Sequence, residues 1–282
     1  MQCPLLYSSF KQRIMQKTIF IIGASSGLGK STAKLFHANG WQVIATMRDP
    51  EKENELKELP NVTVVQLDVT DSEKIKNTIS EVLKSHAVDV VLNNAGYGLI
   101  GPLEAFTDEQ IQTQVQTNLF GVINVTRAFI SYFRERKSGT FINITSTFGL
   151  LGYPTCSIYN ATKFAVDGFS EGLAYELAQF GISVKVVAPG GMQTNFAGRS
   201  LQAGMHEAYS QLVTKVSEGY SEEQIANYTK AEDVAKIIYD AATDNKEQLR
   251  YIAGNDAKGL YQERLELTPE GQFEKLRSQF IF

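Results

Sequence analysis

The feature that most constrains the fold is a regular alternation of short apolar runs with longer segments of helical periodicity, which begins at about residue 18. The seven runs are rich in β-branched residues: TIFIIG, WQVIATM, VTVVQLD, VDVVLNN, GTFINIT, ISVKVVAP and QLRYIAG. Their nearly continuous apolar character is typical of strands buried on both faces, as in a parallel sheet covered by crossover helices. The sequence therefore predicts an α/β fold in which seven mostly parallel strands have helices on both faces.

The predicted helix ends support this division of the chain. Gly40 and Gly181 each follow an apolar periodic segment and precede a strand, where a glycine in the left-handed conformation commonly ends a helix. No linker or change of composition interrupts the alternation. We therefore predict a single domain over residues 17–282, preceded by an N-terminal tail over residues 1–16.

Two stretches depart from the alternation. Residues from about 191 to 229 follow the sixth strand, and an excursion at the carboxyl end of a parallel strand is where a lid over a ligand is expected. An extension from about residue 255 has mixed composition; it could be helical and could pack on a partner subunit.

Composition excludes several classes of protein. With 282 residues, of which 43% are hydrophobic, the chain can bury a sizeable core. A net charge of -4 argues against a nucleic-acid binder, which needs a clustered basic surface. The two cysteines and three histidines have no metal-ligand spacing, and we predict no metal site. No apolar run approaches the roughly 18 residues of a membrane span, so none is predicted.

The N-terminal stretch MQCPLLYSSFKQRIMQ is a poor signal peptide, because it has neither a basic region before its apolar patch nor a cleavage site after it. A cytoplasmic location is the default expectation. Mitochondrial targeting is the alternative interpretation of this stretch.

A glycine-rich turn follows the first strand and opens an amphipathic helix, in the sequence GASSGLGK. Gly23 would allow the tight turn, Gly27 the approach of a pyrophosphate to the backbone, and Gly29 close packing of helix and strand. The N-terminus of the helix would then face the anion. The turn predicts a dinucleotide site, and a turn without ligand is the alternative. The predicted contacts are Gly23, Ser25, Ser26, Gly27, Leu28 and Gly29.

The ends of the next two strands bear on the choice of cofactor. In VIATMRD, Arg48 follows the strand directly and precedes Asp49. An arginine at this point accepts a ribose 2′-phosphate, whereas an acid binds the 2′-hydroxyl, so this order favours NADP over NAD. Alternatively, Arg48 is a surface charge paired with Asp49. Asp68, followed by Val69, would reach the adenine, or else is an acid in a helix N-cap region.

Tyr159 and Lys163 lie one helical turn apart in SIYNATK. A free phenol has a pKa of about 10, too high for proton exchange at neutral pH, and a nearby cation would stabilise the phenolate. The same spacing occurs at Tyr7 and Lys11, in a tail without other signals. The spacing alone therefore cannot identify a catalytic pair.

Further motifs accompany this pair in a fixed order: NNAG at 93–96, Asn118, Ser146 thirteen residues before Tyr159, and PGGMQT at 189–194. With the glycine turn, they resemble the short-chain dehydrogenase/reductase family over residues from about 17 to 254. The resemblance implies a Rossmann-type doubly wound fold. One departure is Ile22, which stands where the family usually has a threonine that helps to hold the turn.

The resemblance also implies roles for individual residues. The catalytic set would be Asn118, Ser146, Tyr159 and Lys163, the last two also contacting the cofactor. Without the resemblance, Asn118 would be interpreted as a buried structural amide, because it lies near the apolar stripe of a helix spanning 109–130. The residues implied on the nicotinamide side are Asn94, Ala95, Gly96, Pro189, Gly190, Met192 and Thr194.

The predicted activity is hydride transfer between NADP(H) and a carbonyl or alcohol, with Tyr159 as general acid and base. The stretches GYGLIGPLEAF and TFGLLGYPT, with Met192, Phe196 and Met205, could form an apolar pocket wall. ATMRD and NNAGYG resemble the branch that acts on steroids and retinoids.

The alternatives are a nucleotide-sugar epimerase, which would need a longer C-terminal substrate domain, and a non-catalytic NADP sensor or scaffold, in which the catalytic set should be eroded. The resemblance further implies a homodimer or homotetramer that associates through the helices carrying Asn118 and Tyr159.

Overall fold

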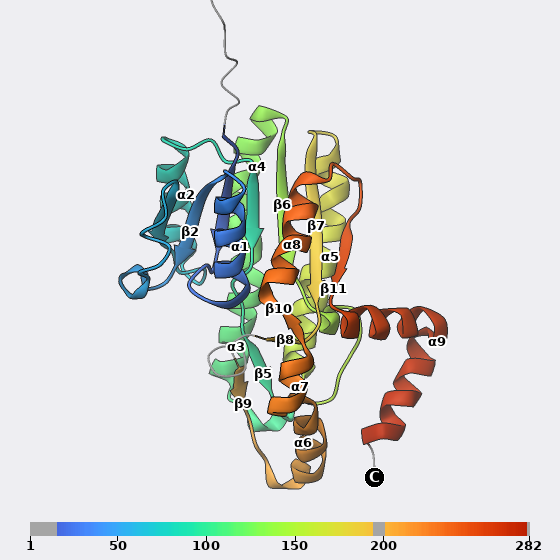
Figure 1. Cartoon of the computed structure of the whole chain (residues 1–282). Coiled ribbons are helices and arrows are strands. Elements are labelled where there is room, and N and C mark those ends of the chain that lie inside the picture. The colour runs from blue at the N-terminus through green and yellow to red at the C-terminus, as the bar shows by residue number, and fades with distance from the viewer. Residues whose placement is uncertain (1–15, 194–200, 281–282) are drawn as a thin grey trace, which may run out of the picture.

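The structure is a computed structural model that describes residues 16–193 and 201–280. Seven parallel strands form its central sheet, in the order β11-β7-β6-β4-β1-β2-β3 (Figure 1). The predicted α/β doubly wound fold is confirmed, and each of the seven predicted runs supplies one strand. Their bounds are β1 (Thr18–Ile22), β2 (Gln42–Met47), β3 (Val62–Gln66), β4 (Val90–Asn93), β6 (Gly139–Ile144), β7 (Ile182–Pro189) and β11 (Arg250–Ala253).

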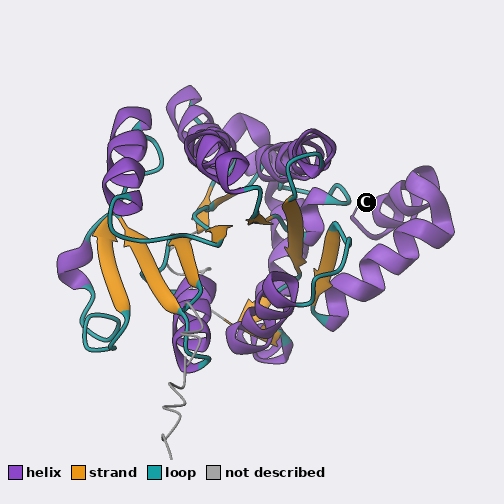
Figure 2. Cartoon of the chain, turned by 90° about the horizontal axis from the view of Figure 1, so that it is seen from above, coloured by secondary structure: helices purple, strands orange, loops and turns teal. Residues whose placement is uncertain are grey.

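Helices cover both faces of this sheet (Figure 2). Alternate residues of β1 point to opposite faces, because successive side chains of a strand alternate. Ile19 and Ile21 pack in a core with α1 and α8, whereas Phe20 and Ile22 pack in a second core with α2, α4 and α5. The sheet is therefore buried on both sides. The helices are α1 (Gly27–Ala38), α2 (Ser72–Leu83), α4 (Gly121–Arg136), α5 (Ser157–Ala178) and α8 (Ala231–Thr243).

The two glycines predicted to end helices have the required backbone conformation. Gly40 follows α1 with φ of +79°, and Gly181 follows α5 with φ of +68°. Side chains rarely adopt this left-handed region, which costs a residue with a Cβ atom about 1 kcal/mol or more. Both glycines turn the chain from a helix into the next strand.

Two small sheets lie beyond the carboxyl ends of the central strands, and the sequence analysis did not predict them. β5 (Gly98–Ile100) pairs with β9 (Leu201–Ala203), and β8 (Met192–Gln193) pairs with β10 (Thr229–Lys230). With α6 (Ser210–Ser217) and α7 (Glu222–Asn227), they form a separate group of elements below the sheet in Figure 1. Residues 201–229, which we call the segment over the sheet edge, thus cover the carboxyl ends of the central strands, where a ligand of this fold class binds.

The chain ends in α9 (Asn255–Phe280), which projects from the body in Figure 1. A break divides α9 into two helical halves at Thr268, which has φ of +65° and is followed by Pro269. Proline cannot continue a helix but suits its first turn, so the second half begins there. Neither α9 nor any other helix among the described residues is long and apolar enough to cross a membrane.

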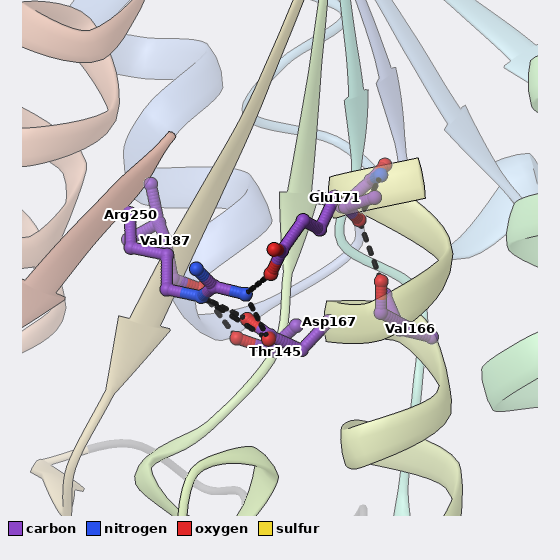
Figure 3. Close-up of polar contacts among 8 residues, drawn as sticks. Thr145, Val166, Asp167, Glu171, Val187 and Arg250 are labelled. Atoms are coloured by element: carbon purple, nitrogen blue, oxygen red, sulfur yellow. Dashed lines mark hydrogen bonds and ion pairs between the residues drawn. The ribbon is translucent and has the colours of Figure 1, made fainter. Parts of the chain in front are cut away.

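An ion-pair cluster fixes the edge strand β11 to α5 (Figure 3). The single Nε–H of Arg250 is shared between the two carboxylate oxygens of Asp167, at 2.9 Å and 3.1 Å. Its Nη2 donates to Asp167 at 2.7 Å and also contacts Glu171. Asp167 is only 8% exposed, and a buried carboxylate requires such a partner. Asp167 stands one turn after Lys163, so this cluster holds the helix that carries the predicted catalytic pair.

Candidate active site

A cavity of about 670 Å³ lies at the carboxyl ends of the central strands. It adjoins β1 and β4, where the strand order reverses, which is the usual ligand site of an open parallel sheet. Most of the predicted site residues line it: Gly23, Ser25, Ser26, Gly27, Leu28, Arg48, Asp68, Val69, Asn94, Ala95, Gly96, Ser146, Tyr159, Lys163, Pro189, Gly190 and Met192. Gly29 and Asn118 lie behind this lining, and Thr194 and Phe196 lie outside the described residues.

The glycine turn needs each of its three glycines. Gly23 and Gly27 have positive φ, +81° and +52°. A Cβ atom at Gly23 would lie 2.9 Å from Cα of Ala95, and one at Gly29 would lie 2.0 Å from the carbonyl oxygen of Gly23. Both distances are shorter than van der Waals contact, so a larger side chain would push the turn and the helix apart.

The N-terminus of α1 suits an anion. Ser26 stands at the N-cap position, but its side chain makes no capping hydrogen bond, and no acidic residue lies in the first turn. The first backbone N–H groups of a helix have no partner inside the helix, and they carry the positive end of its dipole. Because Ser25, Ser26 and Gly27 line the cavity, these groups fit the pyrophosphate of a dinucleotide.

The carboxyl end of β2 brings one cation to the same cavity. Arg48 is exposed and lines it, while its carbonyl oxygen accepts a hydrogen bond from Gln66 at 3.0 Å. The alternative that Arg48 pairs with Asp49 is wrong, because Asp49 pairs with Lys52 at 2.7 Å. Among the described residues, Arg48 has no ion-pair partner, so its guanidinium is available to an anionic ligand.

Asp68 lines the cavity next to Val69 and is held by a local turn. Its Oδ1 accepts hydrogen bonds from the backbone N–H of Thr70 at 2.9 Å and from its hydroxyl at 2.8 Å. The following helix α2 is capped by Asp71. Asp68 thus lies three residues before the N-cap and does not cap α2 itself.

Asn94 connects β4 with the glycine turn. Its side-chain Nδ2 donates to the carbonyl oxygen of Gly23 at 2.7 Å. Ala95 then lies directly under Gly23, and Gly96 faces Asn118, whose Oδ1 would lie 3.1 Å from a Cβ atom at position 96. The NNAG segment thus packs directly against the glycine turn. The contact is so close that a side chain at Gly23 would clash with Ala95.

Asn118 lies on a π-helical turn, residues 116–120, between α3 (Asp108–Val115) and α4. The single continuous helix that the sequence predicts over 109–130 is therefore wrong in detail. A π turn inserts one extra residue and often marks a functional site. Asn118 is 1% exposed, accepts from the Tyr97 N–H at 3.0 Å and donates to the Tyr97 carbonyl at 2.7 Å. It therefore holds the backbone at Tyr97; in this structure it does not bond Lys163.

Ser146 and Tyr159 both line the cavity, and the Ser146 hydroxyl lies within hydrogen-bonding reach of the Tyr159 phenol. Ser146 ends the loop after β6, and its Oγ accepts a hydrogen bond from the Phe148 N–H at 3.2 Å. Burial raises the pKa of Tyr159 to about 12, and the hydroxyl of Ser146 acts in the opposite direction. At neutral pH the phenol is therefore protonated, ready to donate a proton to a developing alkoxide.

Lys163 lies on the same face of α5 as Tyr159. Its side chain is 5% exposed, its Nζ donates to the Ile144 carbonyl at 2.9 Å, and it lies 5.7 Å from the centre of the Tyr159 ring. Burial lowers the pKa of Lys163 to about 8. The amine is thus a cation below this pH and lies near the phenol ring, where its charge can stabilise a phenolate.

Sequence reasoning missed part of the cavity wall, and one of its suggestions is wrong. Met205 is 67% exposed and does not line the cavity. Phe148 and Tyr153, from the expected loop TFGLLGYPT, do line it. The lining residues that the sequence analysis did not name include Tyr220, Ile225 and Tyr228, which lie within the predicted lid, and Asp256 and Leu260 from α9.

A buried asparagine shapes the loop with Phe148 and Tyr153. Asn160 donates from Nδ2 to the carbonyl oxygens of Phe148 at 2.7 Å and Leu151 at 2.9 Å, and it accepts from the Tyr153 N–H at 3.2 Å. Asn160 immediately follows Tyr159, so the same helix turn positions the phenol and this part of the wall.

Few charges face the cavity. Among its described lining residues, the charged side chains are Arg48, Asp68, Lys163 and Asp256. Asp256 accepts a hydrogen bond from the Gly191 N–H at 2.7 Å. No group of His, Cys, Asp or Glu side chains that could hold a metal ion is present in the described part of the chain.

Comparison with known families and curated proteins gives clear matches. A family model described as short chain dehydrogenase matches residues 17–203. The 3-ketodihydrosphingosine reductase of Bacteroides thetaiotaomicron is 38% identical over 196 residues, 68% of this chain and 71% of that protein. Human retinol dehydrogenase 8 is 38% identical over 201 residues, 68% of this chain and 64% of that protein.

Solved structures match over most of the chain. A short-chain dehydrogenase from Streptomyces avermitilis superposes with a TM-score of 0.83 and 33% identity, over 95% of this chain and 100% of that one. A structure of ElxO with NADP bound has a TM-score of 0.72 and 29% identity, over 88% and 100% of the two chains. Similarity therefore extends to the whole central sheet.

Proposed function

The chain belongs to the short chain dehydrogenase family, and from this premise we propose that it is an NADP(H)-dependent oxidoreductase that interconverts an alcohol and a carbonyl compound. The observation that carries the proposal is the convergence of four features on one cavity. These are the uncapped N-terminus of α1, the unpaired Arg48, and the adjacent Tyr159 and Lys163. The first two suit the phosphates of a dinucleotide, and the last two suit proton transfer.

We propose that NADP(H) is preferred over NAD(H). Arg48 reaches the cavity at the end of β2, where the ribose 2′ position of a bound dinucleotide is expected. Guanidinium groups bind phosphate through paired, charge-assisted hydrogen bonds. The NADP bound in the related ElxO structure supports the same preference.

The bound cofactor would supply the hydride, and the residues of this chain would position the substrate and move the proton. In carbonyl reduction, the substrate oxygen accepts hydrogen bonds from the hydroxyls of Ser146 and Tyr159. Tyr159 then donates its proton to that oxygen, and the Lys163 cation stabilises the phenolate that remains. Asn118 fixes the backbone at Tyr97 and so keeps the floor of the site in place.

We propose an uncharged, apolar carbonyl compound or alcohol as the substrate. Beyond Tyr159, the cavity is lined mainly by aromatic and aliphatic side chains, and Asp256 is the one acidic group there among the described residues. Among the described lining residues, no free cation lies at this end to pair with a carboxylate or phosphate of the substrate. The reductase and dehydrogenase named above, by their names, act on largely apolar molecules, which supports the assignment. Residues from about 191 to 229 would act as the lid.

A homodimer or homotetramer is proposed on the basis of exposed aromatic side chains. Phe120, the last residue of the π turn before α4, is 46% exposed, and Phe164 and Tyr175 on α5 are 40% and 76% exposed. Large aromatic side chains in this position suit a subunit interface.

Calorimetric titration with NADPH and, separately, NADH tests the proposed function most directly. We expect NADPH to bind at least tenfold more tightly, since a charge-assisted phosphate contact contributes about 1.5–3 kcal/mol. Equal affinities would contradict the assigned preference. Failure of both cofactors to bind would contradict the proposed function as a whole.

The rate of carbonyl reduction should depend on pH through Lys163. Its pKa is about 8, so the stabilising cation is present below this pH and is lost as the pH rises through it. We expect kcat/KM for a ketone to be constant near neutral pH and to decline above about pH 8, tenfold per pH unit if only the cation is active. Lys163→Arg keeps its charge, so any activity it retains should lack this decline. A wild-type profile that is flat up to about pH 10 would contradict this role.

A further inference from the structure

An unbroken chain of aromatic rings joins the C-terminal helix to the catalytic phenol. The ring of Phe280 lies 5.5 Å from that of Tyr153, edge to face. Tyr153 stacks on Phe148 at 4.7 Å, and Phe148 meets Tyr159 edge to face at 6.5 Å. These distances are those of favourable aromatic pairs. The end of α9 therefore rests against the loop that forms one wall of the cavity.

The two halves of α9 fold back on each other, and we call residues 255–280 the C-terminal hairpin. Gln272 is 1% exposed and donates from Nε2 to the Leu260 carbonyl at 3.1 Å. Lys275 of the second half forms an ion pair with Glu263 of the first. Arg264 donates to the Pro269 carbonyl at 3.1 Å across the break. These contacts hold the second half, and with it Phe280, in a defined position.

The first half of the C-terminal hairpin reaches the cavity itself. Leu260 lines it, as does Asp256 at the start of the helix. The hairpin also lies against α6 and the short turn at residues 147–149. Tyr220, from the segment over the sheet edge, lines the same cavity as Tyr153. The C-terminal hairpin thus adjoins both the loop that carries Phe148 and Tyr153 and the predicted lid.

We propose that the C-terminal hairpin determines the size of the substrate group that the enzyme accepts. In this assignment, Leu260 and Tyr153 contact the larger, apolar substituent of the carbonyl carbon, and Phe280 is a positioning residue that holds Tyr153 in place. The substrate class is a neutral ketone or aldehyde with a flat ring or a comparably bulky apolar group, because aromatic rings form this wall. The proposal rests on the proposed oxidoreductase function.

The test uses aryl methyl ketones of increasing ring size, from phenyl to naphthyl to anthracenyl, reduced with NADPH by the full-length protein. Phe280→Ala frees Tyr153 and should raise kcat/KM for the largest ketone relative to the smallest by about tenfold, mainly through KM. Phe280→Trp should shift the ratio in the opposite direction. The affinity for NADPH should not change in either variant.

Phe273→Ala is the matched control, since Phe273 lies on the same helical half and is 64% exposed. Its ratio between large and small ketones should equal that of the wild type. If Phe280→Ala and Phe280→Trp both give the wild-type ratio, the hairpin does not set the size limit and the proposal is overturned. Thermal unfolding of each variant shows whether the hairpin is still folded.

A binding measurement separates the failure of this proposal from the failure of the proposed function. The same ketones are titrated into Tyr159→Phe loaded with NADPH, with and without Phe280→Ala. Size-selective binding that Phe280→Ala relaxes, in a protein whose wild type reduces no ketone, overturns the oxidoreductase assignment alone. Turnover by the wild type with a size limit that is the same in all variants overturns the hairpin proposal alone.

Discussion

Tyr159→Phe is expected to lower kcat for carbonyl reduction by about a thousandfold, at the centre of the range for removal of a general acid. The substitution deletes only the hydroxyl, whose pKa of about 12 keeps the proton available to the substrate oxygen. The ring that packs edge to face against Phe148 remains, so the fold of the site should be retained. Steady-state rates and calorimetric NADPH binding measure the two effects separately.

Tyr175→Phe is the control for this substitution. It removes the same hydroxyl from the same helix, α5, at a side chain that is 76% exposed and does not line the cavity. Its kcat should match that of the wild type. If Tyr159→Phe weakens NADPH binding as strongly as it lowers kcat, then the residue is structural. If it retains most of the activity, another group supplies the proton.

Arg48→Asp is expected to reverse the choice of cofactor. Loss of the guanidinium removes the partner of the 2′-phosphate, and the new carboxylate repels that phosphate while accepting a hydrogen bond from the 2′-hydroxyl of NADH. We expect kcat/KM for NADPH to fall by about a hundredfold, since losing a charge-assisted hydrogen bond costs about 1.5–3 kcal/mol. The ratio of kcat/KM for NADPH and NADH is the measurement.

Arg127→Asp makes the same change of charge on α4, at an exposed arginine that does not line the cavity. It separates the effect of net charge on the protein from that of a contact with the cofactor. Arg48→Lys keeps the charge but loses the planar, paired donors, so its preference should lie between those of the wild type and Arg48→Asp. An NADPH to NADH ratio that Arg48→Asp leaves unchanged would contradict the assigned contact.

Features encoded by neighbouring residues could be predicted from the sequence. Strand runs buried on both faces appear as continuous apolar stretches, so each central strand was placed. The helix-ending glycines and the tight turn at Gly23 depend on local backbone conformation, and Gly23, Gly40 and Gly181 have the positive φ that these roles require. The pairing of Tyr159 with Lys163 follows from one helical turn.

Features that depend on which distant segments meet could not be predicted. Asp49 forms an ion pair with Lys52 and not with Arg48, because the turn after β2 brings Lys52 close to it. The π turn lies where the side-chain amide of Asn118 bonds both the N–H and the carbonyl of Tyr97, a residue twenty-one positions away.

By itself, then, the sequence determined the α/β fold, the glycine turn and the spacing of the predicted catalytic pair, because each depends on local conformation and hydrophobic periodicity. Only the tertiary structure decided what surrounds the substrate end of the cavity. Tyr220, Leu260 and Phe280 lie far along the chain from Tyr159 and have no motif. They come together because the segment over the sheet edge and the C-terminal hairpin pack on the same loop, and such long-range contacts leave no periodic signal in a single sequence.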